Sequence, residues 1–179
     1  MHFIGFSGSL RKGSYNRALL QAVAELLPEG ATLDTIEIGN LPLYNQDLEV
    51  DFPEAAKDIK GKIRAAEGII VATPEFNRSV SGVLKNMIDW TSRPYGDNAW
   101  AGKPVLVMGC SGGHIGTALA QYDLKKLLLY LNCRVIGQPE IYIGMAQEKF
   151  DASGVLIDDS TKKFLSDGLA PFVEFTGGK

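Results

Sequence analysis

Short apolar runs alternate along the chain with longer segments whose apolar residues recur at helical spacing. An apolar run of about four to eight residues bounded by glycine, proline or polar residues is typical of a buried strand, whereas recurrence at every third or fourth position is typical of a helix. The runs predict strands at residues 2–7, 32–38, 68–73 and 104–108, and a fifth within 134–143. The helical segments predict helices after residue 16, at 53–66, around 80–88, at 115–131 and at 160–176, and residues 39–52 are expected to form a loop.

This alternation predicts the fold class. Strands that alternate with helices pair in parallel, because each helix carries the chain back across the sheet in a right-handed crossover. Five such units predict an α/β, flavodoxin-like three-layer sandwich, in which a five-stranded parallel sheet of order 2-1-3-4-5 has helices on both faces. No repeat or low-complexity tract divides the sequence, so we expect residues 1–179 to form a single domain.

Composition narrows the possible partners. The chain has 179 residues, of which 45% are hydrophobic, so it can bury a core without disulfides or metal ions. Its formal net charge is −3 and it has no basic run, which argues against nucleic acid or an anionic membrane surface as a partner. No apolar stretch approaches the ~20 residues of a membrane span. Cys110 and Cys133 have neither metal-ligand spacing nor a disulfide pattern, so we expect a cytoplasmic protein without a metal site.

The loop after the first strand carries the clearest candidate chemistry. Its sequence, Gly8-Ser9-Leu10-Arg11-Lys12-Gly13-Ser14-Tyr15-Asn16, joins a buried strand to the start of a helix, where α/β proteins bind phosphate groups. Glycines let the backbone approach an anion closely. Hydroxyls, free N–H groups, the helix dipole and the Arg11 guanidinium attract it.

Better-known phosphate motifs do not fit this loop. A P-loop needs lysine after its second glycine, but Ser14 follows Gly13, and the glycines of the segment lack the spacing of a dinucleotide fingerprint. A cysteine-phosphatase loop starting at Cys110 would need an arginine where Gly116 stands. The remaining fit is a loop for a terminal phosphate monoester, and an ordinary strand-to-helix turn is the alternative.

The predicted topology brings this loop next to two others. In an open α/β sheet, ligands bind beyond the carboxyl ends of the strands, where the strand order reverses. For this order the reversal lies between the first and third strands, where residues 8–16, 74–79 and 110–116 are expected to meet. These are also the most chemically distinctive segments of the chain. Their coincidence predicts one ligand site built from all three.

Motifs in these segments and in the helix after residue 79 resemble those of a known family. Residues 8–16, the run Thr73-Pro74-Glu75-Phe76-Asn77 and residues 82–90 are similar to those of the NADPH-dependent FMN reductases, and within that family to the quinone and chromate reductases. The resemblance implies bound FMN and a homodimer or tetramer. It also implies electron transfer from NADPH or NADH to quinones, metal oxyanions or similar small acceptors. Because the flavin carries the chemistry, we expect no catalytic side chain and a ping-pong mechanism.

The resemblance also assigns cofactor contacts residue by residue. The FMN phosphate is expected to be held by Ser9, Arg11, Ser14, Tyr15 and Asn16. Leu10 and Lys12 of the same loop are also expected to contact the cofactor, and the alternative for Lys12 is that it only screens the anion from solvent. The ribityl chain and the isoalloxazine ring are expected beside the second loop, at Pro74, Glu75, Phe76, Asn77 and Arg78. The pyrimidine side of the ring is expected next to Ser111, Gly112 and Gly113.

Several residues have plainer interpretations. Glu75 opens a loop before a helix, where a carboxylate is more often a helix cap than an acid catalyst. Cys110 follows a buried strand, where a cysteine more often packs as a small apolar residue than acts as a redox thiol. By the resemblance, Asp89, Trp90 and Tyr122 are expected near a dimer interface, and the alternative is that they are ordinary core and surface residues. Tyr95 and Trp100 either line the acceptor pocket or have no such role.

The chain departs from the family pattern at Arg78, where relatives often have tyrosine, and at Ser81, where proline is common. Arg78 puts the range of acceptors in question, but not FMN binding. Three other functions remain open for the same fold: a flavodoxin-type electron carrier, a free-flavin reductase, and a regulatory protein without activity. Such carriers tend to be strongly acidic, and a net charge of −3 is only mildly so.

Overall fold

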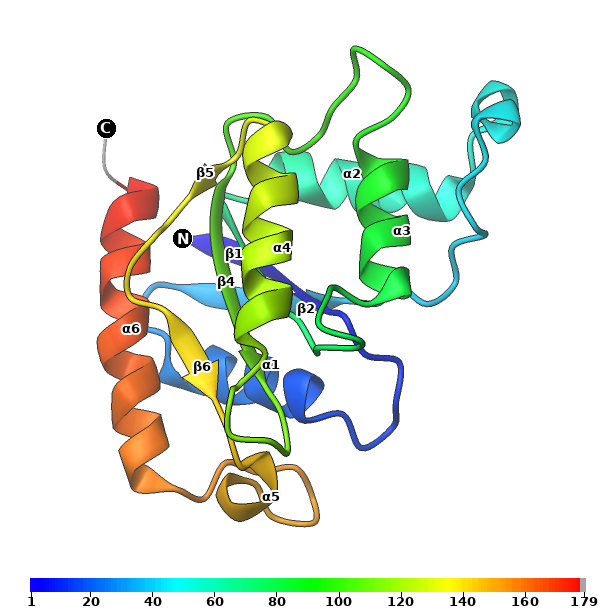
Figure 1. Ribbon diagram of the computed structural model, residues 1–179. Helices are drawn as coiled ribbons and strands as arrows, with labels where there is room; N and C mark the ends of the chain where they lie inside the picture. Colours follow the sequence, from blue (N-terminus) through cyan, green and yellow to red (C-terminus); the bar gives the residue numbers. More distant parts are fainter. Residues whose placement is uncertain (178–179) are drawn as a thin grey trace.

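The computed structural model describes residues 1–177 and is built around one parallel sheet (Figure 1). Its strands are β1 (His2–Ser7), β2 (Thr32–Ile36), β3 (Gly68–Ala72), β4 (Pro104–Cys110), β5 (Arg134–Val135) and β6 (Ile141–Ile143). Their order is β2-β1-β3-β4-β5, β6 also pairs with β4, and every pairing is parallel. The predicted order 2-1-3-4-5 is confirmed.

Helices cover both faces of this sheet. They are α1 (Tyr15–Leu26), α2 (Glu54–Ala65), α3 (Gly82–Thr91), α4 (Ala118–Tyr130), α5 (Ala146–Lys149) and α6 (Asp159–Gly177), with a 3-10 helix, η1, at Gln46–Asp51. Side chains of α1 and α6 pack in one apolar cluster, and those of α2, α3 and α4 in a second. Figure 1 shows α6 on one side of the sheet and α2, α3 and α4 on the other, so the three-layer sandwich is confirmed. No helix within residues 1–177 is long and apolar enough to cross a lipid bilayer.

The central strands are built around apolar runs because both of their faces are covered. Along β4, Val105 and Val107 join the cluster under α2, α3 and α4, while Leu106 and Met108 join the cluster under α1 and α6. None of the four is more than 2% exposed. Successive side chains of a strand point to opposite faces, so a strand buried on both faces requires an unbroken apolar run. Each such side chain stabilises the fold by about 1.5–3 kcal/mol.

The fifth strand differs from the prediction because it is interrupted. Its two pieces, β5 and β6, flank residues 136–140, which contain Gly137 and Pro139. Proline has no N–H to donate to a neighbouring strand, and glycine has no side chain to pack, so both weaken strand structure. β5 pairs with the start of β4 and β6 pairs with its end, so the two pieces share one neighbour.

Helix α4 begins at Ala118, three residues later than predicted. Gly116 and Thr117 precede it with φ angles of 64° and 68°, in the left-handed region that a right-handed helix does not use. A Cβ at Gly116 would lie 2.6 Å from the backbone N of Ile143. Only glycine fits at position 116. Because residues 116 and 117 are not helical, α4 starts only at Ala118.

Candidate functional site

The three loops that the sequence singles out meet at the carboxyl edge of the sheet. Gly8 N donates to Ala72 O at 2.9 Å, which joins the first loop to the end of β3, and Thr73 N donates to Met108 O at 2.9 Å, which joins β3 to β4. A Cβ at Gly8 would lie 2.8 Å from Pro74 Cδ. The first and second loops are therefore in contact, and the sheet holds the third beside them.

Asn16 connects the first loop to the third. Its Nδ2 donates to Cys110 O at 3.0 Å, and its Oδ1 accepts from Cys110 N at 3.0 Å. The side chain is buried, so the first turn of α1 is fixed to the last residue of β4. The Asn16 side chain thus positions the first and third loops. A ligand at the helix start can therefore bond Asn16 through its main-chain N–H.

The start of α1 provides an anion-binding geometry. Ser14 caps the helix, and its Oγ accepts from Arg17 N at 3.3 Å. The first N–H groups of a helix have no partner within it. Among the described residues, no acceptor bonds the main-chain N–H of Tyr15 or Asn16. These groups and the positive end of the helix dipole favour a negative charge at this point.

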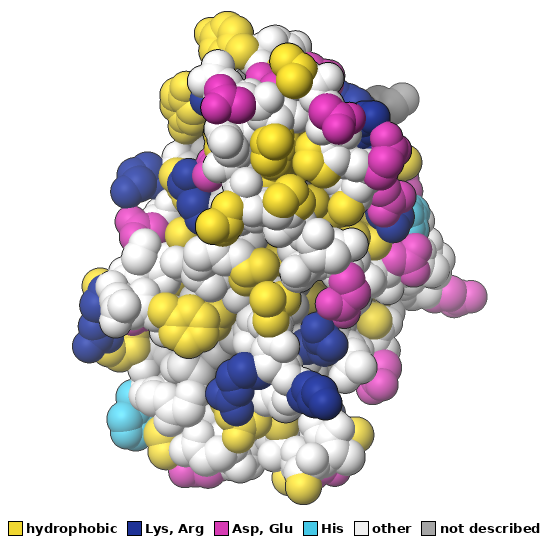
Figure 2. Space-filling model, turned by 90° about the vertical axis from the view of Figure 1, so that its right-hand side faces the viewer, with side chains coloured by type: hydrophobic (Ala, Val, Ile, Leu, Met, Phe, Trp, Pro, Cys, Tyr) yellow, Lys and Arg dark blue, Asp and Glu magenta, His cyan; other side chains and the backbone are white. Residues whose placement is uncertain are grey.

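The rest of the first loop surrounds this helix start. Ser9 is buried, whereas Leu10, Arg11 and Lys12 are exposed. The side of the molecule shown in Figure 2 has several Lys and Arg side chains in its lower half, beside hydrophobic ones. A cavity of about 370 Å³ borders the loop, lined by Lys12, Ser14 and Tyr15 and, across from them, by residues 151–154.

The second loop folds into a tight hairpin. Phe76 and Ser79 exchange two main-chain hydrogen bonds, of 3.2 and 3.0 Å. Between them Asn77 and Arg78 have φ angles of 50° and 65°. Two successive positive φ values are the mark of a type I′ turn, which asparagine adopts readily and arginine rarely. The turn leaves Phe76 half-exposed and puts Arg78 at its tip.

Glu75 is a helix cap, as its plainer interpretation predicts, although of α4 rather than of the helix that follows it in sequence. Its Oε2 accepts from Leu119 N at 3.0 Å and from Ala120 N at 3.2 Å. Beyond the hairpin, Ser79 Oγ donates to Asp123 Oδ2 at 2.7 Å. The second loop is therefore attached on both sides of its turn to the first two turns of α4.

The third loop is held by a segment that the sequence did not single out. Ser111 N donates to Ile143 O, Ala146 N donates to Ser111 O, and Met145 N donates to Gly113 O, each at 3.0 Å. This leaves Gly112 between two anchored residues. No motif in residues 143–146 indicates this role in the sequence.

The comparison with known proteins agrees with these motifs. The model of the family described as NADPH-dependent FMN reductase matches residues 1–148. The chain belongs to this family. The predicted resemblance is confirmed, and with it an enzyme that uses FMN and takes electrons from NAD(P)H.

Relatives in the FMN reductase family are similar over nearly their whole length. The chain is 48% identical to a quinone reductase of Pseudomonas putida over 169 residues, which cover 94% of this chain and 90% of the relative. It is 46% identical to the 2-hydroxy-1,4-benzoquinone reductase of a Burkholderia species over 158 residues, covering 88% and 86%.

Solved structures show the same FMN reductase architecture. The flavoenzyme NAD(P)H:(acceptor) oxidoreductase of Paracoccus denitrificans superposes with a TM-score of 0.92 at 40% identity, covering 98% of this chain and 97% of that one. A second structure, an NADH:FMN oxidoreductase without ligand, has a TM-score of 0.70 at 22% identity and supports the fold alone.

Three side chains considered for roles in this FMN reductase are buried in its core. Cys110 is 2% exposed, and burial raises the pKa of its thiol to about 12, so the packing interpretation holds. Trp90 is fully buried and its Nε1 donates to Pro42 O at 2.8 Å. Trp100 is fully buried as well, with Nε1 bonded to Thr91 Oγ1. The suggestion that Trp100 lines an acceptor pocket is wrong, because its ring does not reach the surface. The ring of Trp90 is buried as well, and a position of Asp89, Trp90 and Tyr122 near a dimer interface stays a prediction.

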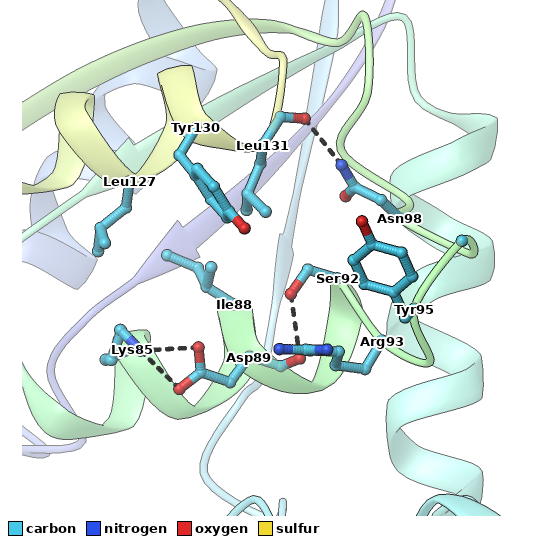
Figure 3. A pocket seen from close by; sticks show the side chains of 11 residues that line it. Lys85, Ile88, Asp89, Ser92, Arg93, Tyr95, Asn98, Leu127, Tyr130 and Leu131 are labelled. Atoms are coloured by element: carbon cyan, nitrogen blue, oxygen red, sulfur yellow. Dashed lines mark hydrogen bonds and ion pairs between the residues drawn. The ribbon is translucent and has the colours of Figure 1, made fainter. Parts of the chain in front are cut away.

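A separate cavity of about 400 Å³ lies between α3 and the end of α4 in this FMN reductase (Figure 3). Ile88, Leu127 and Leu131 form its apolar wall, and Tyr95 and Tyr130 lie at its rim. Both tyrosines are largely exposed, at 91% and 85%. None of the residues predicted to bind FMN lines this cavity.

Proposed function

We propose that the protein is an NAD(P)H:quinone oxidoreductase whose FMN lies where the three loops meet. The observation that carries the proposal is the convergence of these loops around the start of α1, in a chain of the NADPH-dependent FMN reductase family. The residues present fit the phosphate of FMN. The N–H groups of Tyr15 and Asn16 lack partners within residues 1–177, and a Cβ at Gly13 would meet nothing within 4 Å, so there is open space beside them.

In this proposal each loop has a different part in binding. The first loop holds the phosphate through its hydroxyls, its main chain and the charge of Arg11. The second borders the ribityl chain and the ring, with the exposed face of Phe76 beside the ring. The third presents the main-chain N–H groups of Gly112 and Gly113 to the pyrimidine side, next to Ser111. The contacts of Glu75 with α4 and of Asn16 with Cys110 keep the three loops at fixed distances from one another.

The chain needs no acid or base of its own for this reaction. Bound FMN supplies the chemistry, since it accepts a hydride from NAD(P)H and passes two electrons to an acceptor. The protein orients both substrates. The N–H groups of Asn77, Arg78, Gly112 and Gly113, which donate to no acceptor within residues 1–177, stabilise the negative charge that develops on the ring. A quinone acceptor takes up two electrons and two protons, of which one is supplied with the hydride of NAD(P)H and the other by solvent, and it leaves as a hydroquinone.

Quinones are the acceptors that we propose first, because the relatives from Pseudomonas putida and Burkholderia are named for quinone substrates. Chromate or another metal oxyanion is a second acceptor of the same open site. We also propose a cytoplasmic location, because NAD(P)H is a cofactor found inside cells.

The exposed rim of the α3–α4 cavity supports the proposal of a homodimer or tetramer. Tyr95, Leu129 and Tyr130 are each more than half exposed around this cavity or next to it. A second copy that covered these side chains would remove apolar surface from water. Light scattering on protein eluted from a size-exclusion column measures the mass of the particle. A monomer at micromolar concentration would contradict this part of the proposal.

Steady-state kinetics test the proposed mechanism. If donor and acceptor use one site in turn, double-reciprocal plots of rate against NADPH at several fixed quinone concentrations give parallel lines. Intersecting lines would mean that both substrates bind together, which contradicts the one-site proposal. A flavodoxin-type carrier would instead show no rapid steady-state oxidation of NADPH by quinone, and a free-flavin reductase would depend on added FMN as a substrate.

A further inference from the structure

We propose that Arg78 makes the acceptor site select negatively charged oxidants. This inference rests on the proposed function and deepens it by naming the class of acceptor, namely quinones that carry a sulfonate, carboxylate or ionised hydroxyl group. The observation that carries it is the position of the Arg78 guanidinium. It lies at the tip of the second loop, beside the N-terminus of α4.

The backbone presents Arg78 toward the open side of the site. The residue occupies the tip of a two-residue turn with a φ of 65°, a conformation that costs an arginine energy and that the two bonds between Phe76 and Ser79 maintain. Its side chain is 66% exposed. The turn therefore holds a flexible cation outside the core instead of burying it.

The partner of Arg78 fixes where that cation lies. Arg78 Nη1 donates to Glu75 Oε1 at 3.2 Å, and the other oxygen of Glu75 accepts from Leu119 N and Ala120 N. The guanidinium thus lies beside the N-terminus of α4, between the second loop and the helix that follows the third. The second and third loops are the two that are proposed to flank the flavin ring.

The charge that faces solvent here is positive. Glu75 is only 11% exposed, and both of its oxygens have partners, so its negative charge is compensated by the helix N-terminus as well as by Arg78. The nearby carboxylate of Asp123 is likewise bonded, to Ser79 Oγ and to Lys126 Nζ. Arg78 uses one of its five N–H donors for Glu75, and the others are available to an anion.

Other basic residues do not account for this selectivity. Arg11 and Lys12 lie on the first loop, where the FMN phosphate would neutralise their charge. Lys126 lies more than one turn further along α4, and its Nζ pairs with Asp123 at 3.1 Å. Of these four cations, Arg78 is the one placed to act on an acceptor over the ring.

The test uses the oxidative half-reaction, which excludes the donor from the measurement. Holoenzyme reduced in advance is mixed without oxygen with 1,4-naphthoquinone-2-sulfonate or with neutral 1,4-naphthoquinone, and the second-order rate constants of reoxidation are compared. The quantity of interest is the ratio of the sulfonate rate to the neutral rate in each variant, divided by the same ratio in the wild type. Differences in the intrinsic reactivity of the two quinones cancel in this comparison.

Charge at position 78 is expected to control the ratio. Because the side chain is largely exposed, Arg78→Gln lowers the ratio about threefold to fivefold at low ionic strength, and ~0.5 M salt reduces the difference to less than about twofold. Arg78→Lys keeps the charge, and its ratio stays within about twofold of the wild type. Lys126→Gln is the matched control, since Lys126 is also a largely exposed cation paired with one carboxylate, but it lies outside the hairpin. Its ratio should stay close to that of the wild type.

Two results would overturn the inference. One is an unchanged ratio in Arg78→Gln; the other is an equal fall in Arg78→Lys, which would mean that the shape of arginine matters and its charge does not. If the reduced wild type is not reoxidised even by the neutral quinone, the proposed function itself is wrong and the inference falls with it. These failures are distinguishable, because only the last appears in the wild type.

Discussion

Removal of the Glu75 carboxylate is expected to destabilise the start of α4. In the structure this side chain accepts from two main-chain N–H groups, those of Leu119 and Ala120, and contacts Arg78. In Glu75→Ala all three contacts are lost. Leu119 is exposed, so water can replace the carboxylate at its N–H, but Ala120 is fully buried and its N–H has poorer access to water.

The size of the effect follows from these contacts. Loss of a side-chain cap costs about 0.5–2 kcal/mol, and loss of a carboxylate at the positive end of a helix costs a further ~0.3–1 kcal/mol. We therefore expect Glu75→Ala to lower the free energy of unfolding by about 0.8–3 kcal/mol, toward the upper end because Ala120 is buried. Glu75→Gln keeps an acceptor oxygen and loses only the charge, so its loss should be about 0.5–1 kcal/mol. In a protein of this size each kcal/mol lowers Tm by about 2–4 °C.

Urea unfolding followed by far-UV circular dichroism measures these differences, with FMN at one saturating concentration for every variant. Glu54→Ala is the control, because Glu54 also lies in the first turn of a helix but is 87% exposed and, within residues 1–177, pairs only with Lys57. Its loss should be below about 0.5 kcal/mol. A Glu75→Ala protein as stable as the wild type, or a Glu75→Gln protein as unstable as Glu75→Ala, would refute the assignment of Glu75 as the cap of α4.

Three further predictions concern the first loop, a buried lysine and the thiols. Arg11→Ala removes a charge-assisted bond worth about 1.5–3 kcal/mol, so fluorescence titration should show FMN binding about tenfold to a hundredfold weaker, and unchanged affinity would place the phosphate elsewhere. Asp97→Asn weakens the ion pair with Lys60, whose side chain is 4% exposed and whose Nζ lies 2.7 Å from Asp97 Oδ2. Urea unfolding at pH 7 should show a loss of about 1–2 kcal/mol, because Lys60 keeps its bond to a backbone carbonyl. The hydrogen bond from Lys60 lowers the pKa of Asp97, so its contribution is complete above the pKa of the unfolded carboxyl and is lost as pH falls through the folded pKa. The variant and the wild type should therefore converge in acid, and a gap that widens there would contradict the ion pair. Burial raises the pKa of both Cys110 and Cys133 to about 12, so a thiol reagent at pH 8 should label neither until the protein is unfolded, and rapid labelling of the native protein would show that one of them is accessible.

The architecture of the protein could be predicted from local patterns. The unbroken apolar runs of β1, β3 and β4 require burial on both faces, which only a covered parallel sheet provides. The strand order then followed from the chain topology, and the site followed from the strand order. Gly8 illustrates the agreement, since a loop glycine noted for close approach to a ligand also makes the contact with Pro74 possible.

The details of the site depended on partners distant in sequence. Nothing near Asn16 indicates that its amide pairs with Cys110, 94 residues away. Glu75 was expected to cap a helix, but the helix that it caps begins more than 40 residues later, because the carboxyl edge places the second loop against α4. The interruption of the fifth strand has a local signal in the sequence, Pro139, which has no N–H to donate to a neighbouring strand.

The central claim is that FMN bound at the three loops carries two electrons from NAD(P)H to a quinone. An absorbance spectrum of the purified protein tests it most directly, followed in the same anaerobic cuvette by NADPH and then by benzoquinone. The account predicts flavin bands that bleach with NADPH and return in full with benzoquinone. A spectrum with no flavin band, even after FMN is added, would contradict it.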